Sequence, residues 1–183
     1  MASISIPLSK TEMGKIRPIR IMHDLPKIAD LVELCFKHNM DGEGKRYVQQ
    51  MRRASQNAGF LNWASNSPPL TGYVWVEEKQ IVGNISIVPF RKKGIVFLLA
   101  NIAVHPDFRR RGIARLLTQK GMEHARQRRA ESIWLQVEDD NPSAIKLYEN
   151  LGFQTRARRT TWDAVSEPDP RKVVAQTIVT SRT

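Results

Sequence analysis

Four arginines surround one glycine in the middle of the chain, and together they could bind a phosphate-bearing ligand. The glycine is Gly112, and the arginines are Arg109, Arg110, Arg111 and Arg115. Guanidinium groups present forked donors that suit phosphate oxygens, and a glycine lets a phosphate approach the backbone closely. The same residue types also make an ordinary solvated basic turn. Whether the loop is a phosphate site or a solvated basic turn therefore has to be judged from the elements on either side of it.

Those elements favour the phosphate site. Residues 96–104 are apolar on both faces, as in a central strand, and a helix over 113–129 and a strand over 131–137 complete a parallel crossover unit. A helix N-terminus presents unpaired N–H groups and partial positive charge to an anion, and Ala114 leaves its first turn open. The order of strand, basic glycine loop, helix and strand therefore predicts a binding site for a pyrophosphate. The spacing is neither that of a P-loop nor that of a GxGxxG fingerprint.

The first half of the chain predicts elements that would support this unit. A short strand over 16–20 contains Pro18, which indicates a sheet edge, and Asp24 is expected to cap a helix that ends near residue 36. We expect a loop at 38–44, a second helix over 45–57 and a loop at 62–71. Strands over 73–78 and 81–88 then form an antiparallel meander with 96–104.

The second half predicts three further elements. Asn141 and Pro142 begin a helix that Gly152 ends. Residues 153–163 resemble a last strand. A run rich in proline and acidic residues follows, and 173–179 is either a strand or the start of an element beyond this chain.

Composition limits the classes of protein that fit. The chain has 183 residues, of which 41% are hydrophobic, and this balance suits one globular domain and excludes a collagen or a disulfide scaffold. The net charge of +11 favours an anionic partner. One cysteine, no secretory signal and no apolar stretch of membrane length favour a cytoplasmic protein with no metal site and no membrane contact.

Two motifs resemble the GCN5-related N-acetyltransferases, the GNAT family. Arg109-x-x-Gly112-x-Ala114 is similar to the family's acetyl-CoA signature. Asn141-Pro-Ser-Ala-Ile-Lys-Leu-Tyr148-Glu-Asn-Leu-Gly-Phe153 is similar to its Asn-x-x-Ala-x-x-Leu-Tyr-x-x-x-Gly-Phe box. The strand sequence at 101–104, Asn-Ile-Ala-Val, further resembles the branch of the family that acetylates a ribosomal-protein alanine. The resemblance as a whole covers about residues 15–163.

The resemblance implies an α+β fold, with a mixed, mostly antiparallel central sheet, helices on both faces and a splayed pair of parallel strands. It implies a domain over 15–165, between an N-terminal tail at 1–14 and a C-terminal extension at 166–183. It also implies acetyl-CoA as cosubstrate and direct attack of an amine on the thioester.

The resemblance assigns roles to individual residues. The pantetheine arm would bind the strand backbone at Ile102, Ala103 and Val104, and Asn141 would touch it. The pyrophosphate would lie on the signature loop, which comprises Arg109, Arg110, Arg111, Gly112, Ile113, Ala114 and Arg115. Tyr148 would donate a proton to the leaving thiolate. By its pattern alone, Tyr148 could also be a core residue, and Asn141 is a helix cap on its own merits.

One departure from the family concerns the general base. The ribosomal-alanine branch has a glutamate twelve residues before the tyrosine, and this chain has Gln136 there. A neutral amide cannot take a proton at neutral pH. Glu138, on the same strand face, is our first substitute. Asp139, Asp140 and a water relay to bulk remain alternatives.

Other distinctive side chains have simpler interpretations. Cys35 lies on the apolar stripe of the first helix and is expected in the core, as are Trp75 and Trp134 in their strands. His105 is expected to be a turn residue beside the signature. Trp63 is the candidate to line an acceptor pocket, together with the loop at 38–44.

The predicted function is transfer of acetyl from acetyl-CoA to a primary amine, with a protein N-terminus, a lysine or a small amine as acceptor. Two alternatives are a catalytically weak CoA-binding regulatory module and a basic protein associated with ribosomes or RNA. The chain has no aromatic–basic RNA motif, which disfavours nucleic acid as a direct ligand. Both a monomer and a homodimer fit the sequence.

Overall fold

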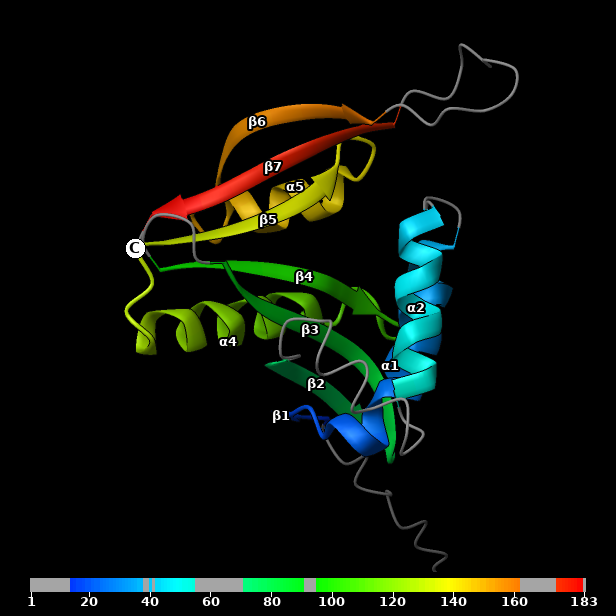
Figure 1. Ribbon diagram of the computed structural model, residues 1–183. Helices are drawn as coiled ribbons and strands as arrows, with labels where there is room; N and C mark the ends of the chain where they lie inside the picture. The colour runs from blue at the N-terminus through cyan, green and yellow to red at the C-terminus, as the bar shows by residue number, and fades with distance from the viewer. Residues whose placement is uncertain are drawn as a thin grey trace, which may run out of the picture.

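The computed structural model describes residues 14–37, 40, 42–54, 71–90, 95–161 and 174–182. Their strands form one seven-stranded sheet in the order β1-β2-β3-β4-β5-β7-β6 (Figure 1). Neighbouring strands are antiparallel except for β4 and β5, which are parallel. The strands are β1 (Lys15–Pro18), β2 (Thr71–Glu77), β3 (Gln80–Phe90), β4 (Val96–Val104), β5 (Ser132–Glu138), β6 (Gln154–Thr161) and β7 (Val174–Arg182).

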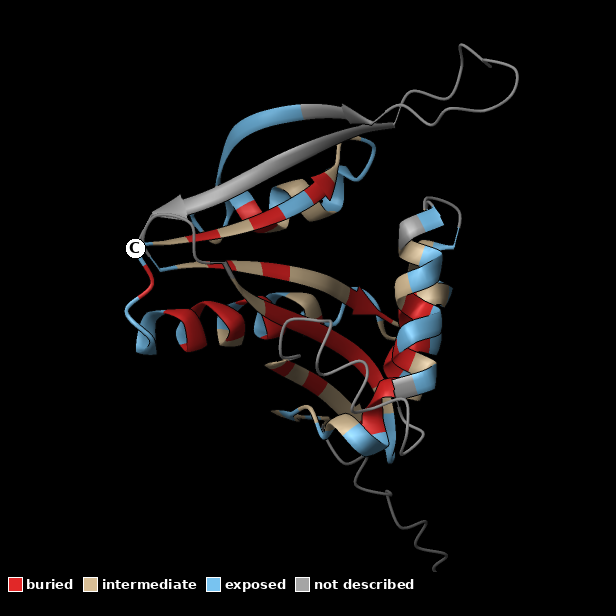
Figure 2. Cartoon of the chain, viewed as in Figure 1, coloured by how far each residue is buried: buried red, intermediate tan, exposed pale blue. Residues whose placement is uncertain are grey.

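Helices lie on both faces of the sheet, as expected for the fold. They are α1 (Ile21–Phe36), α2 (Gly42–Ala54), α4 (Ile113–Gln127) and α5 (Pro142–Glu149), with a short 3-10 helix, η1, at Pro106–Phe108. Figure 2 shows that α1, α2, α4 and α5 each carry buried residues among exposed ones.

Each face of the sheet is covered by its own cluster of buried apolar residues. The cluster under α4 and α5, called the α4 cluster, includes Ile85, Leu99, Leu117, Leu135 and Tyr148. The cluster under α1 and α2, called the α1 cluster, includes Leu25, Ile28, Val48, Met51 and Ala103.

The central unit confirms the sequence predictions closely. The structure places β4 at its expected bounds, starts α4 at residue 113 and pairs β4 in parallel with β5. The meander of β2, β3 and β4 is also confirmed, and β1 is an edge strand, as Pro18 indicated. The unit that carries the basic loop is thus the middle of the sheet.

The starts of both N-terminal helices were predicted wrongly. Helix α1 begins at Ile21, because Asp24 lies inside the first turn and accepts the Arg20 backbone N–H at 2.7 Å. Arg17 donates to both carboxylate oxygens of Asp24 and holds it there. Helix α2 begins at Gly42, inside the expected loop at 38–44. The Gly42 carbonyl accepts a hydrogen bond from the Arg46 side chain at 3.2 Å, which stabilises this first turn.

The strand expected at 173–179 is an interior strand of the sheet. It is β7, and it pairs with β5 on one side and β6 on the other. The sheet therefore continues beyond residue 165, where the sequence had suggested a boundary. The expected tail up to residue 13, the loop residues 62–70 with Trp63, and residues 162–173 lie outside the described residues.

Among the described helices, none combines the length and the apolarity that crossing a bilayer requires.

A histidine is buried between α4 and the sheet. His124 is 5% exposed, and the Tyr73 hydroxyl lies 3.0 Å from its Nδ1. Burial lowers the pKa of His124, and the positive charges of Arg128 and Lys120 lower it further. The folded protein therefore holds this ring neutral more strongly than the unfolded chain does.

This burial predicts acid sensitivity. As the pH falls below about 6.5, the unfolded chain binds a proton at His124 before the folded chain does, so the free energy of unfolding decreases. Replacing His124→Gln should flatten this slope in urea titrations between pH 5 and 8. The exposed His23→Gln is the control and should retain the slope. An unchanged slope in His124→Gln would contradict the prediction.

Candidate active site where strands β4 and β5 part

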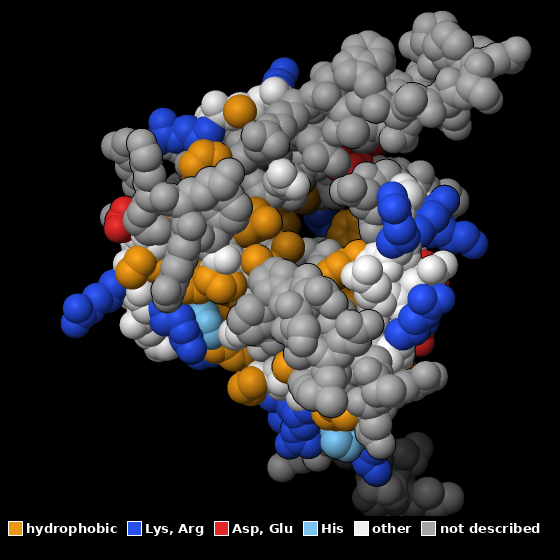
Figure 3. All heavy atoms as spheres, viewed as in Figure 1, with side chains coloured by type: hydrophobic (Ala, Val, Ile, Leu, Met, Phe, Trp, Pro, Cys, Tyr) orange, Lys and Arg blue, Asp and Glu red, His pale blue; other side chains and the backbone are white. Residues whose placement is uncertain are grey.

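The two parallel strands share hydrogen bonds along only part of their length. Their register ends at Leu99 opposite Leu135, yet β4 continues to Val104 and β5 to Glu138. The ribbons diverge toward these C-terminal ends in Figure 1. Figure 3 shows a hollow lined by hydrophobic side chains at the same level. Beyond Leu99 and Leu135 the two strands therefore no longer pair with each other, and this gap is a candidate position for an extended ligand.

A bulge in β4 lies at this gap. The register with β3 shifts between Asn84 and Ser86, and Asn101 has a positive φ of 50°. The Asn84 side chain donates to the Asn101 carbonyl at 3.0 Å, and the Asn101 amide donates to the Ser86 hydroxyl at 3.4 Å. A bulge bends its strand and re-aims its side chains. Here polar side chains on β3 hold the strand in that shape.

The basic loop leads from β4 into an uncapped helix. Gly112 precedes α4 with a φ of 78°, a conformation in which an L side chain is strained, and a Cβ there would meet nothing within 4 Å. No side chain caps α4. The N–H groups of its first turn have no acceptor within the helix. Together with the helix dipole, they form an anion site of backbone donors.

The four arginines of the loop divide into two pairs. The Arg109 Nε donates to the Val104 carbonyl at 3.2 Å, and Arg111 forms a 2.6 Å ion pair with Glu77 while lying 5.3 Å from the centre of the Phe108 ring. The Arg111 guanidinium lowers the pKa of Glu77.

Arg110 and Arg115 are exposed. Arg109 and Arg111 are exposed too but have partners within the protein, and a contact of any of the four with a ligand's phosphates remains a prediction. Sequence spacing could not show the partner of Arg111, because Glu77 is far away along the chain.

The end of β4 offers fewer free groups than expected. The Val104 carbonyl accepts hydrogen bonds from both Arg109 and the Cys35 thiol, the latter at 3.3 Å. One of the backbone groups expected to hold a ligand, the Val104 carbonyl, therefore already has partners within the protein. Cys35 itself is half-buried against the α1 cluster, near its predicted core position, and burial raises the pKa of its thiol.

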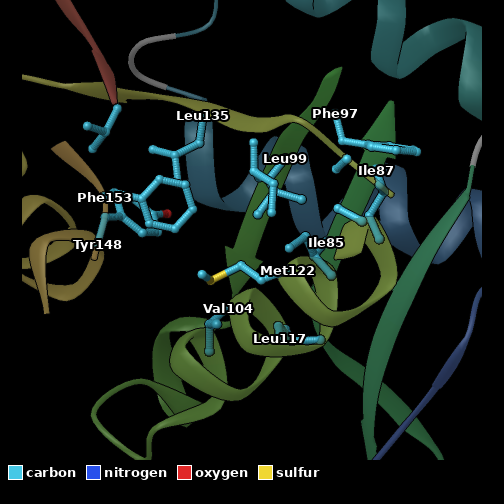
Figure 4. Close-up of a cluster of buried hydrophobic side chains, with 14 of the residues drawn as sticks. Ile85, Ile87, Phe97, Leu99, Val104, Leu117, Met122, Leu135, Tyr148 and Phe153 are labelled. Carbon is cyan, nitrogen blue, oxygen red and sulfur yellow. The ribbon is translucent and has the colours of Figure 1, made fainter. Parts of the chain in front are cut away.

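Tyr148 is buried in the α4 cluster with 6% of its surface exposed. Its ring packs edge-on against Phe153 at 6.0 Å, and Figure 4 shows both rings beside Leu135. Burial raises the pKa of Tyr148 to about 12, so its hydroxyl stays protonated at neutral pH. Because Leu135 is the last residue of β5 that pairs with β4, the Tyr148 ring lies in the part of the core next to the gap.

Asn141 caps α5, as predicted. Its side-chain oxygen accepts the Ala144 N–H at 3.1 Å, and Pro142 follows at the first helical position. The cap fixes where α5 begins and so places Tyr148 two turns later. A contact between Asn141 and a ligand remains a prediction.

The candidate base lies on the opposite face of the sheet from Tyr148. Leu135 and Val137 belong to the α4 cluster, so alternation along β5 turns Gln136 and Glu138 toward the α1 side. Gln136 is exposed and Glu138 is half-buried. An acid and a base on opposite sides of the gap could serve different atoms of one bound molecule.

Two other predictions have mixed outcomes. His105 is confirmed as a turn residue, since its Nδ1 accepts the Asp107 N–H at 3.4 Å and caps η1. Trp75 packs, half-buried, against the α4 cluster. The core position expected for Trp134 is wrong, because this residue lies on the other face of β5 and its indole donates to the Ser132 hydroxyl at 3.0 Å.

Tyr47 is a site residue that the sequence did not indicate. This half-buried side chain of α2 packs against the α1 cluster, and burial raises the pKa of its hydroxyl, an effect that the nearby side chain of the bulge residue Asn101 partly offsets. Its position one residue before Val48, which is buried against α1, could have indicated a place at the edge of the core. The partner on β4 could be found only from the fold.

Comparison with known proteins agrees with this geometry. Residues 28–153 match the acetyltransferase (GNAT) family. The chain belongs to this family.

One relative and two solved structures show how far the likeness extends. The [ribosomal protein bS18]-alanine N-acetyltransferase of Salmonella typhimurium is 42% identical over 64 residues, which are 35% of this chain and 43% of that protein. The match therefore spans less than half of that relative's length.

The structures share the fold at low sequence identity. The ribosomal-protein-S18-alanine N-acetyltransferase of Escherichia coli has a TM-score of 0.68 at 21% identity, covering 93% of this chain and 94% of its own. A Bacillus subtilis acetyltransferase in complex with CoA has a TM-score of 0.66 at 15% identity, covering 93% and 99%. This GNAT family chain thus shares its overall fold with these proteins.

Proposed function

We propose that the protein transfers an acetyl group from acetyl-CoA to a primary amine. The observation that carries the proposal is the uncapped N-terminus of α4 beside the parted strands β4 and β5. This arrangement offers backbone donors for a pyrophosphate and a backbone-lined gap for the arm that follows it. A CoA thioester has both parts, and membership of the GNAT family supports this choice of cosubstrate.

The chain's groups suggest how the cosubstrate would lie. The pyrophosphate would accept hydrogen bonds from the amides between Arg110 and Arg115, with the exposed guanidinium groups of these two residues close by. A hollow of about 380 Å³ lies beside α4 between Arg115, Arg126 and Asn150, and the nucleoside end would lie there. The pantetheine arm would bind the backbone of β4 at Ile102, Ala103 and Val104.

The reaction needs two proton movements at different atoms. The amine nitrogen attacks the thioester carbon, the C–N bond forms, and the C–S bond breaks. The nitrogen loses a proton and the leaving thiolate gains one. Tyr148 is our proposed acid, because its protonated hydroxyl lies on the α4 side of the gap. Solvent then restores its proton.

Glu138 is the proposed base on the opposite face. It is the acidic side chain of β5 that alternation turns toward the α1 side, and Gln136 cannot take a proton. Asp139 and Asp140 follow in the turn after β5 and are the next candidates.

Glu138→Gln should lower kcat/KM most at pH values below the pKa of the acceptor amine.

The acceptor is proposed to be an exposed amine of a protein or a small molecule. The name of the Salmonella relative points to the α-amine of a protein N-terminus as the first acceptor to test. A CoA-binding module without catalysis remains the second candidate, because Gln136 stands where a base is expected.

The proposal is tested by CoA release from acetyl-CoA in the presence of peptides, polyamines and aminoglycosides, with product mass as confirmation. Acetylated product supports transfer. Measurable CoA binding without any turnover between pH 6 and 10 would instead favour the regulatory module.

Replacing Tyr148→Phe should separate catalysis from binding. The variant keeps the ring that packs on Phe153 and loses only the donor, so we expect kcat to fall roughly a hundredfold with little change in thermal stability. Stopped-flow or coupled assays of CoA release measure this. A kcat within twofold of the wild-type value would remove Tyr148 from the mechanism.

A pair of glycine variants tests the phosphate site. Gly112 and Gly152 both have positive φ, 78° and 88°, and a Cβ added to either residue would meet no atom within 4 Å. Each change to alanine should cost about 1–2 kcal/mol of stability through backbone strain. Only Gly112→Ala should also weaken CoA binding in calorimetry. Equal CoA affinity in the two variants would argue against the loop as the binding site.

A further inference from the structure

The polar groups around the β4 bulge form a cluster whose role the proposed reaction has not yet used. The cluster comprises Tyr47, Asn84, Ser86 and Asn101, and we call it the bulge cluster. Two hydrogen bonds join its strand residues, one from Asn84 to the Asn101 carbonyl and one from Asn101 to Ser86, and Tyr47 lies near enough to the Asn101 side chain to affect the pKa of its own hydroxyl. It contains amides and hydroxyls and no formally charged side chain.

The bulge cluster lies on the α1 side of the sheet. Asn84 is directly opposite Ala103 in the register, and residues opposite each other on antiparallel strands point to the same face. Ala103 packs in the α1 cluster, so Asn84 faces that side too. Tyr47 reaches the bulge from α2, which packs on α1.

This face is where an acceptor must arrive. On the other face, α4 and its cluster fill the space against β3 and β4, with Leu99, Leu117 and Ile85 almost completely buried. A nucleophile approaching a thioester between the parted strands therefore has to come from the α1 side. Asn101 of β4 and Tyr47 of α2 are polar side chains on this side of the sheet, and both are half-buried.

The cluster also has unused hydrogen-bonding capacity. Asn84 is completely buried, and its Oδ1 accepts no hydrogen bond from any side chain or backbone group in the described part of the chain. A buried amide oxygen without a donor is destabilising. An additional N–H or O–H donor joining the cluster would let its amides rearrange and satisfy this oxygen.

We propose that Tyr47 and Asn101 position the acceptor by hydrogen-bonding an uncharged amide group that lies next to its reactive amine. This inference rests on the proposed function. Hydroxyl and amide groups match the donors and acceptors of a peptide group, while they offer no counter-charge for a carboxylate or a second ammonium. Burial raises the pKa of Tyr47, so this hydroxyl remains neutral and acts in positioning and not as a base.

Tyr47→Phe tests the proposal because it removes one oxygen and keeps the ring that packs on the α1 cluster. The acceptors are a tripeptide amide with a free N-terminus and n-propylamine, which has no neighbouring amide. We expect the KM for the peptide to rise roughly three- to tenfold, as for the loss of one hydrogen bond. The kcat, the KM for acetyl-CoA and the kcat/KM for propylamine should stay within twofold.

A matched control is available on the other face. Tyr73→Phe also removes one hydroxyl from a half-buried ring, but Tyr73 contacts His124 beneath α4 and should leave both acceptors unaffected. A merely structural effect of Tyr47→Phe would change both acceptors, or acetyl-CoA, alike.

The outcomes separate failure of the positioning role from failure of the proposed function. An unchanged KM for the peptide in Tyr47→Phe, equal losses for peptide and propylamine, or a wild-type protein that acetylates propylamine and not the peptide would each overturn the positioning role alone. A wild-type protein that binds CoA but acetylates neither acceptor would overturn the proposed function and the positioning role with it.

Discussion

The site depends on the point where two parallel strands stop sharing hydrogen bonds. Buried backbone groups are almost always paired, so strands left apart in the middle of a sheet need other support. On one side, β4 is held by β3 through a bulge that Asn84 and Ser86 fix. On the other side, β5 pairs with β7 as far as Glu138. The gap is thus held open by its neighbours and is not a local defect.

The remaining features follow from that gap. Its wall on the α4 side is apolar and contains a tyrosine that burial keeps protonated. Its wall on the α1 side carries neutral polar groups and the exposed or half-buried residues of β5. The uncapped helix at the end of β4 adds an anion site. The proposed attack of an amine on a thioester needs the α4-side and α1-side environments on opposite sides of the thioester carbon.

Local pattern was enough to predict the centre of this arrangement and not its surroundings. The crossover of β4, α4 and β5 and the Asn141 cap each depend on nearby residues, and the sequence indicated them correctly, while the burial of Tyr148 was one of two interpretations that its pattern allowed. The pairing of Arg111 with Glu77, the insertion of β7 between β5 and β6 and the contact of Tyr47 with Asn101 join distant segments. No spacing or periodicity encodes such contacts. The net charge of +11 likewise could not show which arginines have partners.

The most direct test of the cosubstrate site is to follow backbone amide signals by NMR while CoA is added to the protein. We expect the largest shifts at Gly112, Ile113, Ala114 and Arg115 and along Ile102 and Ala103. Small shifts at these amides, with large ones instead around the separate hollow lined by Lys27, Ile81 and His105, would contradict the binding of CoA between β4 and β5.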